Sequence, residues 1–284
     1  MVITYTNEHG TIRMNGTGSD NAWCIYEITG IGFPKKNYTY NTYAGIIGHE
    51  KNTETIPSRV MTISGDISEK AQKSLSMSRA MRILNTDGEL TIQTGNKVRR
   101  ARVRTLDFTP AERKSVFKSF VLQIEADIPY FFGMDTLKYN IFSREGLLSS
   151  PFVLPCAFGR RNTYADIFNS GDVECEPVLE IYKPLTEDTA EYAGPLVLLN
   201  ETTGAKITLN HIMTTGETVI IDIPNRKITS DVYGNLLNNI SLDTILRDFV
   251  LKTGKNRVSF ESDDKTLVVS CSFEEMYLEA SHDE

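Results

Sequence analysis

A run of arginines in one extended segment is the first feature of this chain that could recognise another molecule. The segment reads Lys97-Val-Arg-Arg-Ala-Arg-Val-Arg104. In a strand, Arg100, Arg102 and Arg104 would point to one side, with successive side chains roughly 7 Å apart. Guanidinium groups pair well with carboxylates, and a neighbouring subunit could supply them. The segment, Arg99 included, is therefore either a solvated face or an assembly surface, and it lacks the interleaved aromatic residues typical of nucleic-acid binding.

Catalytic and metal-binding patterns are not evident in the sequence. The four histidines have no His or Cys neighbour at ligand spacing, and the chain has no Gly-x-Ser-x-Gly, P-loop or calcium-loop motif. Asp263 and Asp264 could be the paired carboxylates of a glycosidase, but they fall in a predicted turn, where Asp is expected for backbone reasons. We therefore expect no enzyme activity, no cofactor and no metal site.

Length and charge indicate two domains with different surroundings. The chain has 284 residues, which exceeds what one hydrophobic core usually serves. Residues 1–150 carry 19 Lys and Arg against 15 Asp and Glu, whereas residues 151–284 carry 11 against 22. The acidic second half argues against specific nucleic-acid binding. No run of about 18 apolar residues and no secretory signal is evident, so we expect no membrane span.

The four cysteines are widely scattered and form no Cys-x-x-Cys motif. They stand at positions 24, 156, 175 and 271. Cys175 and Cys271 fall in the apolar phase of predicted strands. Together with the lack of a secretory signal, this predicts free thiols and no disulfide.

The first domain is expected to span residues 1–146 and to be a β-sandwich with one long helix. Strands are predicted at 2–5, 11–14 and 22–28, and a further strand at 59–63 is expected to end at Gly65-Asp66. The helix is predicted at about 68–85, where Ser68 can cap the first turn.

Two more segments of the first domain have readable patterns. Residues from about 89 to 106 form two extended runs joined by Gly95-Asn96, which predicts a β-hairpin. Tyr38, Tyr40 and Tyr43 lie in a Gly-flanked stretch that is either a contact surface or a partly buried strand.

The second domain is expected to span residues 147–284 and to be a β-sandwich, after a linker at 143–155. Residues 173–181 alternate between apolar and acidic side chains, which predicts a strand with one buried face. Pro177 cannot donate a ladder hydrogen bond, so this strand should lie at a sheet edge or contain a bulge. Residues 242–249 are either a short helix or an irregular crossing.

The order of these parts resembles the distal tail protein (Dit) family of siphophages of Gram-positive bacteria and of their prophage relatives. The resemblance rests on the terminator Ile124-Glu-Ala-Asp-Ile-Pro-Tyr-Phe-Phe132 and on Phe168-Asn-Ser-Gly-Asp-Val-Glu-Cys-Glu-Pro-Val-Leu-Glu-Ile181. It continues through Asn200–Ile207, Thr215–Asp222 and Leu251–Val258. Each motif alone is weak, so their order carries the resemblance.

The resemblance implies a mainly β protein with a ring-forming belt domain and a galectin-like, jelly-roll sandwich. It implies a structural phage or prophage component at the virion tail tip, made in the bacterial host cytoplasm. Its hexameric ring would join the tail tube protein to a tail-associated lysin, tail fibre or receptor-binding protein of the baseplate. The alternative is a carbohydrate-binding module that recognises a host cell-wall glycan through the second domain.

Overall fold

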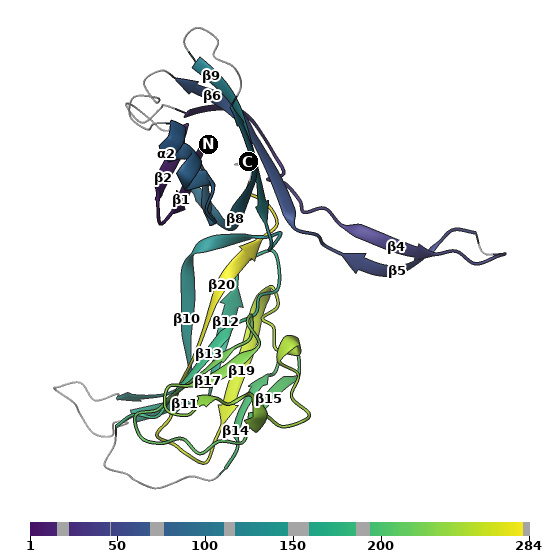
Figure 1. Ribbon diagram of the computed structural model, residues 1–284. Coiled ribbons are helices and arrows are strands. Elements are labelled where there is room, and N and C mark those ends of the chain that lie inside the picture. Colours follow the sequence, from purple (N-terminus) through teal and green to yellow (C-terminus); the bar gives the residue numbers. More distant parts are fainter. Residues whose placement is uncertain are drawn as a thin grey trace. The chain divides into compact units, whose positions relative to one another are not determined.

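The computed structural model describes residues 1–15, 23–45, 47–68, 77–110, 117–146, 159–185 and 194–280. The chain is mainly β, as the sequence predicts. It divides into two compact units: unit 1 is Met1–Met134 with Met276–Glu284, and unit 2 is Asp135–Glu275. The chain passes between the units within two strands, β10 (Phe131–Gly146) and β20 (Val268–Tyr277) (Figure 1).

Unit 1 holds nine further strands and one described helix. These are β1 (Val2–Asn7), β2 (Gly10–Met14), β3 (Trp23–Thr29), β4 (Asn37–Asn41), β5 (Glu50–Thr55), β6 (Arg59–Ser68), α2 (Met77–Leu84), β7 (Gly88–Thr94), β8 (Lys97–Pro110) and β9 (Phe117–Ala126). The predicted hairpin is confirmed, since β7 and β8 pair antiparallel around Gly95-Asn96. Gly95 has φ 57, a conformation that suits glycine in a two-residue hairpin turn.

The main sheet of unit 1 closes on itself. Its strands run in the order β8-β7-β1-β2-β3-β6-β9, and β9 also pairs with β8. Closure removes the free edges that an open sheet would present. The expected β-sandwich is therefore a barrel, and its interior is filled by apolar side chains such as Tyr5, Met61 and Phe120.

Only the second half of the predicted helix lies within the described residues. Ser68, the expected cap, is the last residue of β6, and α2 begins at Met77; residues 69–76 lie outside the described part of the chain. Gly65 does not end the strand. A Cβ atom at Gly65 would lie 2.2 Å from the carbonyl oxygen of Cys24 and 2.9 Å from the ring of its cross-strand partner Phe120, so this glycine makes room for close contacts inside a continuous strand. Within α2, Met81 is exposed and Ala80, Ile83 and Leu84 are buried.

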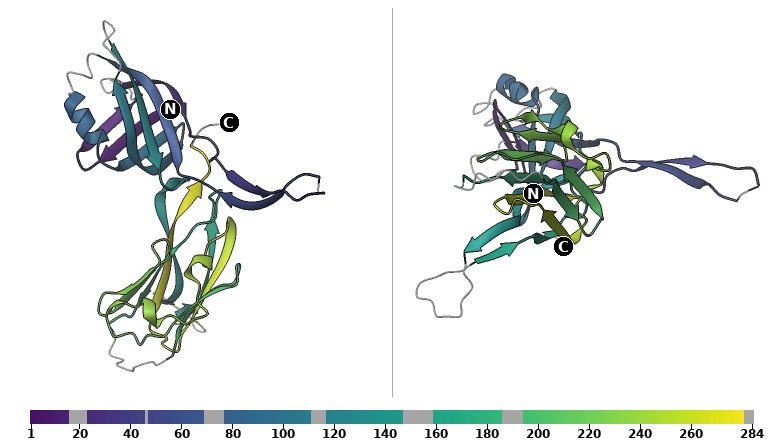
Figure 2. Two further views of the ribbon diagram at one scale, coloured as in Figure 1. Left: turned by 45° about the vertical axis from the view of Figure 1, so that its right-hand side comes forward. Right: turned by 90° about the horizontal axis from the view of Figure 1, so that it is seen from below.

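β4 and β5 form a separate two-stranded sheet, which we call the arm. They pair with each other and with no other described strand. Figure 1 and Figure 2 show this ribbon without a neighbouring strand in either view. All residues of β5 are exposed. A two-stranded ribbon is marginal in water without a packing partner, so the arm is suited to contact another surface.

Unit 2 consists of two sheets packed face to face. Its other elements are β11 (Gly159–Asn162), β12 (Tyr164–Asn169), β13 (Val178–Tyr182), β14 (Leu196–Asn200), β15 (Ala205–Leu209), β16 (Thr218–Asp222), β17 (Lys227–Ser230), β18 (Gly234–Asn235), η2 (Leu237–Asn239), η3 (Leu246–Asp248) and β19 (Gly254–Glu261). One sheet has the order β18-β17-β16-β13-β20-β10, and the other has β12-β19-β14-β15. The rings of Phe142 and Phe260 meet across the core at 5.2 Å.

Two details of unit 2 differ from the sequence predictions or decide between them. β13 is an interior strand between β16 and β20. Pro177 is the residue directly before β13, so its missing N–H falls outside the strand and the proline does not mark a sheet edge. Residues 237–248 form two single turns of 3₁₀ helix beside β15, where Ile240 bridges to Leu209. This favours the irregular crossing over a helix.

The unit boundary also differs from the expected one at residue 146. β10 runs as one strand from Phe131 through Met134 into unit 2, so no turn residue marks the change. Residues 143–146 of the predicted linker are paired with β11, and 147–155 lie outside the described residues.

No helix in the described segments is long and apolar enough to cross a membrane.

Candidate assembly surfaces

The arginine segment forms the first half of β8, and its side chains divide between two faces. Arg99 shares a face with the buried residues Ala101 and Val103, and its guanidinium lies 3.4 Å from the ring centroid of Tyr277. Arg100, Arg102 and Arg104 lie on the other face, as the sequence predicts. The four arginines therefore do not form one surface.

Carboxylates that pair with these arginines were expected from a neighbouring subunit, but the same chain supplies them. Arg100 donates from Nε to the carbonyl of Gly133 at 2.8 Å, and its Nη1 lies 3.4 Å from Glu89 Oε2. Arg104 donates to Glu125 Oε2 at 3.1 Å and also pairs with Asp127. The Glu125 contact raises the pKa of Arg104.

Arg102 and Arg104 are the exposed members of the stripe, whereas Arg100 is partly covered. The guanidinium of Arg102 lies 5.9 Å from the ring centroid of Phe132. Together with Arg104 it borders an open depression of about 460 Å³. The other residues of the depression are mainly acidic or apolar: Asp87, Gly88, Glu89, Val103, Glu125, Asp127 and Ile128. This surface has mixed charge, whereas the sequence predicted a basic one.

The arm presents a second candidate surface, built from aromatic side chains. Tyr38, Tyr40 and Tyr43 are all exposed, which favours a contact surface over a partly buried strand. The rings of Tyr38 and Tyr40 lie 6.3 Å apart, and Lys51 lies 4.6 Å from the Tyr38 ring centroid. Neighbouring exposed aromatic rings on a polar ribbon are typical of a protein contact.

Arg59 anchors the base of the arm. It is buried and donates to the carbonyls of Gly30 at 2.7 Å and Gly32 at 2.5 Å, in the segment that leads into β4. Further hydrogen bonds go to the carbonyls of Pro129 at 2.7 Å and Leu278 at 2.8 Å. Burial lowers the pKa of Arg59 to about 10. No local sequence pattern indicates this role, because the partners are backbone carbonyls far apart along the chain.

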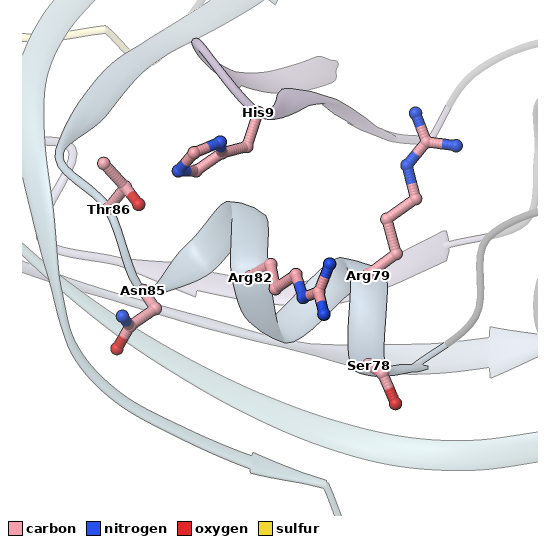
Figure 3. Close-up of a pocket in the computed structure, with 6 residues that line it drawn as sticks. All are labelled: His9, Ser78, Arg79, Arg82, Asn85 and Thr86. Carbon is pink, nitrogen blue, oxygen red and sulfur yellow. The ribbon is translucent and has the colours of Figure 1, made fainter.

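A third surface, which we call the basic pocket, lies beside α2 (Figure 3). It has a volume of about 550 Å³. The residues that line it are His9, Ser78, Arg79, Arg82, Asn85 and Thr86. Figure 3 shows the His9 ring approaching from the β1–β2 turn, across from the side chains of the helix. No sequence pattern indicated this pocket, since His9 is about 70 residues away from the helix in the chain.

Of the two adjacent acids considered for catalysis, Asp263 is exposed and Asp264 belongs to a buried structural contact in unit 2. Asp264 Oδ2 lies 3.0 Å from Lys183 Nζ, and the two side chains are 4% and 5% exposed. Asp264 Oδ1 accepts hydrogen bonds from the backbone N–H and hydroxyl of Thr266. Burial would raise the pKa of Asp264, but the Thr266 and Lys183 contacts outweigh it and lower that pKa.

A second buried carboxylate, Glu217, holds three segments of unit 2 together. Its Oε1 lies 2.6 Å from both His211 Nε2 and Ser230 Oγ, and its Oε2 accepts from the backbone N–H of Thr214 at 2.8 Å. Burial would raise the pKa of Glu217, but the hydrogen bonds from Ser230, Thr214 and His211 outweigh it and lower that pKa. Ser230 and His211 both contact the same carboxylate oxygen, so Glu217 links the segments that carry these two residues.

The described cysteines are free thiols. Cys24 is exposed, and Cys175 and Cys271 are buried. Burial raises the pKa of Cys175 to about 12 and also raises that of Cys271. Cys156 lies outside the described residues. Among the described residues, no group of three or more His, Cys, Asp and Glu side chains could hold a metal ion.

One family model and several solved structures are similar to this chain. Residues 170–277 match the family model described as siphovirus-type tail component, C-terminal domain. The crystal structure of SPP1 Dit (gp 19.1), described as a paradigm of the hub adsorption apparatus in phages infecting Gram-positive bacteria, is similar over 98% of this chain and 100% of its own, with a TM-score of 0.66 and 13% identity.

A second solved structure, the phage P2 baseplate in its activated conformation with Ca, has a chain that is similar over 96% of this chain and 97% of its own, with a TM-score of 0.50 and 13% identity. At this identity, both structures show a shared fold. No curated protein sequence matches the chain significantly. The resemblance to distal tail proteins is confirmed: residues 170–277 match the C-terminal domain of siphovirus-type tail components of the SPP1 Dit family.

Proposed function

We propose that this protein is the hub of a phage or prophage tail tip, where six copies form a ring through unit 1. The ring would join the tail tube to the host-adsorption apparatus, and the role would be structural, without catalysis. The family match over residues 170–277 supports a tail component, and the fold shared with SPP1 Dit supports a hub.

The arm is the single observation that carries ring formation through unit 1. It exposes three tyrosines on a two-stranded ribbon that pairs with no other described strand. Burying these rings against a neighbouring copy would remove apolar area from water, which is the main driving force of association. Arg59 fixes the base of the arm, so the ribbon is oriented before the copies meet.

The experiment is a light-scattering mass measurement of the full chain, combined with electron microscopy of the particles. We expect rings of six copies, and we expect the Tyr38→Ser, Tyr40→Ser and Tyr43→Ser triple variant to remain a monomer with an unchanged thermal melt. A matched control removes three exposed aromatic residues of unit 2: Tyr164, Phe168 and Tyr233. A triple arm variant that still forms six-membered rings would contradict this role of the arm.

The mixed-charge depression is a second proposed contact of the ring. The exposed guanidinium of Arg102 would contact an acid of the neighbouring copy there. Arg102→Glu places a like charge among Glu89, Glu125 and Asp127 and should weaken assembly.

Carbohydrate binding through unit 2 is the second candidate, and one observation favours it. Tyr164 and Phe168 are exposed on the same face of β12, and Asp166 lies between them. Arg257 holds Asp166 at 2.8 Å and lies 4.6 Å from the Tyr164 ring centroid. Two exposed rings around a fixed polar group could hold a glycan. Binding of purified host cell walls that Tyr164→Ala and Phe168→Ala abolish would favour this candidate.

A further inference from the structure

One edge of the four-stranded sheet in unit 2 is open. β12 lies at the end of that sheet and pairs with β19 alone among the described strands. The backbone N–H of Phe260 in β19 donates to the carbonyl of Thr163 at 3.0 Å. Successive residues of an antiparallel pair alternate between bonding toward the partner strand and bonding away from it. The backbone groups of Tyr164, Asp166 and Phe168 therefore point away from β19, to the open edge.

The pairing of β19 on its other side leads to the same direction for Asp166. Arg257 stands opposite Asp166 in the ladder. The backbone N–H of Arg257 donates to Thr202 Oγ1 at 3.0 Å, and its carbonyl accepts from the N–H of Glu201 at 2.9 Å. Both groups are directed away from β12, so the N–H and carbonyl of Asp166 face outward.

β12 lacks the features that normally protect an edge strand. It contains no proline and no lysine, and its register with β19 has no bulge. The side chains of Tyr164 and Phe168 are 46% and 55% exposed. Its one charged side chain, Asp166, is paired with Arg257 at 2.8 Å and with Lys255 at 2.9 Å. The edge is therefore a regular, weakly charged template for another strand.

Charge indicates what kind of strand would bind there. Asp166 and, after it, Glu201 raise the pKa of Arg257, so cations beside the edge are balanced by nearby acids. Residues 151–284 carry 11 Lys and Arg against 22 Asp and Glu, so the wider field attracts a basic segment. Two copies of β12 paired symmetrically about Asp166 would place like charges directly opposite each other, which is unfavourable.

We propose that β12 accepts a basic, extended segment of another tail protein as an additional antiparallel strand. Main-chain hydrogen bonds to Tyr164, Asp166 and Phe168 would supply the affinity. Apolar side chains of the segment would lie beside the two rings, and a lysine would lie beside Asp166, whose carboxylate can accept a further hydrogen bond. The inference rests on the proposed function only in taking the segment from the tail. It uses the backbone edge, whereas the glycan candidate uses the ring faces.

The test uses the full chain and the blocked peptide Thr-Val-Thr-Lys-Thr-Val-Thr, which can place valine, lysine and valine beside Tyr164, Asp166 and Phe168. We expect saturable binding in an NMR titration at low salt. In the free protein, the amides of these three residues should exchange with solvent faster than those of Ala165 and Ile167. The bound peptide should slow the exchange of all three.

Matched peptides and variants isolate the main-chain contact. N-methyl groups on the valine and lysine amides remove the donors that face β12 and should weaken binding roughly tenfold or more. The same number of N-methyl groups on threonine amides, which face away, should leave binding unchanged. Phe168→Pro and Phe168→Ala both lack the ring, but only proline lacks the edge N–H, so Phe168→Pro should bind roughly threefold or more weakly than Phe168→Ala. A circular dichroism melt verifies that both variants are folded.

Several outcomes would overturn the proposal. One is peptide binding that is absent, or equal for the two N-methylated peptides. Another is tighter binding of the analogue with glutamate in place of lysine, which would assign an acidic partner. A doubled mass in light scattering that Phe168→Pro abolishes would make the occupant a second copy of this chain. Peptide binding needs neither the ring nor the tail, so failure of the ring experiment leaves this result readable, and the reverse also holds.

Discussion

Arg59 donates a hydrogen bond from Nη2 to the backbone carbonyl of Leu278, 219 residues later in the chain, at 2.8 Å. The same guanidinium binds three other carbonyls, so one side chain joins the start of β6, the base of the arm and the returning C-terminal segment. Phe131 lies beneath it, with its ring centroid 4.6 Å from the guanidinium carbon.

Arg59→Met should destabilise unit 1 by about 2–5 kcal/mol, because it leaves buried carbonyls without donors. Arg59→Lys should recover little of this, since one ammonium cannot reach carbonyls on several sides of a planar fork. Urea denaturation followed by Trp23 fluorescence measures the loss. A lysine variant as stable as the natural protein would show that charge alone is needed.

Arg100 and Arg102 should respond differently to charge reversal. Arg100 is largely covered and binds the Gly133 carbonyl, so Arg100→Glu should lower the melting temperature of the monomer. Arg102 is exposed, so Arg102→Glu should leave the melt within about 0.5 kcal/mol of the natural stability and act on assembly alone. Thermal melts and light-scattering masses of both single variants distinguish these effects. Equal melts for the two variants would contradict the assigned contacts.

Removing one partner of the Lys183–Asp264 pair should destabilise unit 2 more than removing both charges. Lys183→Met leaves a buried carboxylate without its partner and should destabilise unit 2 by about 3–5 kcal/mol. Adding Asp264→Asn removes that charge and should restore part of the loss. The coupling between the two sites follows from a double-mutant cycle in urea. Additive losses would show that the pair does not interact.

Glu217 should make unit 2 sensitive to acid. Its pKa is lowered in the folded protein, so it binds a proton less readily there than in the unfolded chain. Its stabilisation is therefore complete above the ordinary glutamate value and is lost as the pH falls through the lower folded value. Urea midpoints between pH 7 and pH 3 measure this. Glu217→Gln should be less stable at neutral pH and should show a weaker decline in acid.

The thiols should differ strongly in reactivity. The thiolate is the reactive form, and burial keeps Cys175 and Cys271 protonated far above neutral pH. At pH 8, iodoacetamide should therefore modify Cys24 in the folded protein while sparing Cys175 and Cys271, as peptide mass spectrometry can show. Unfolding in urea should make all of them reactive. Rapid modification of Cys271 in the folded protein would contradict its burial.

Local patterns sufficed for much of the fold. The β7–β8 hairpin follows from two extended runs around Gly95-Asn96, and the strands of unit 2 follow from their alternation. Gly65 was misread because glycine serves both turns and close contacts, and only the neighbouring Phe120 ring decides between them. Pro177 was misread because a strand can begin directly after a proline and still lie inside a sheet.

The candidate surfaces were harder to predict from the sequence, because the residues that form each of them are distant in the chain. The spacing of Arg100, Arg102 and Arg104 correctly placed them on one face. The acids that pair with Arg104 come from 21 and 23 residues later, and only the β8–β9 register brings them close. The basic pocket combines a turn near the N-terminus with a helix beginning at Met77, a proximity that no local pattern encodes.

The two crossings between the units have a consequence for how this chain can be rebuilt. Unit 1 is discontinuous, and the whole of unit 2 is an insertion between Met134 and Met276, carried on the neighbouring strands β10 and β20. A modular exchange should therefore cut at those two points and not once near residue 146. Joining them with a short turn would yield the barrel as a free-standing module, and a foreign domain with adjacent termini could take the vacated place.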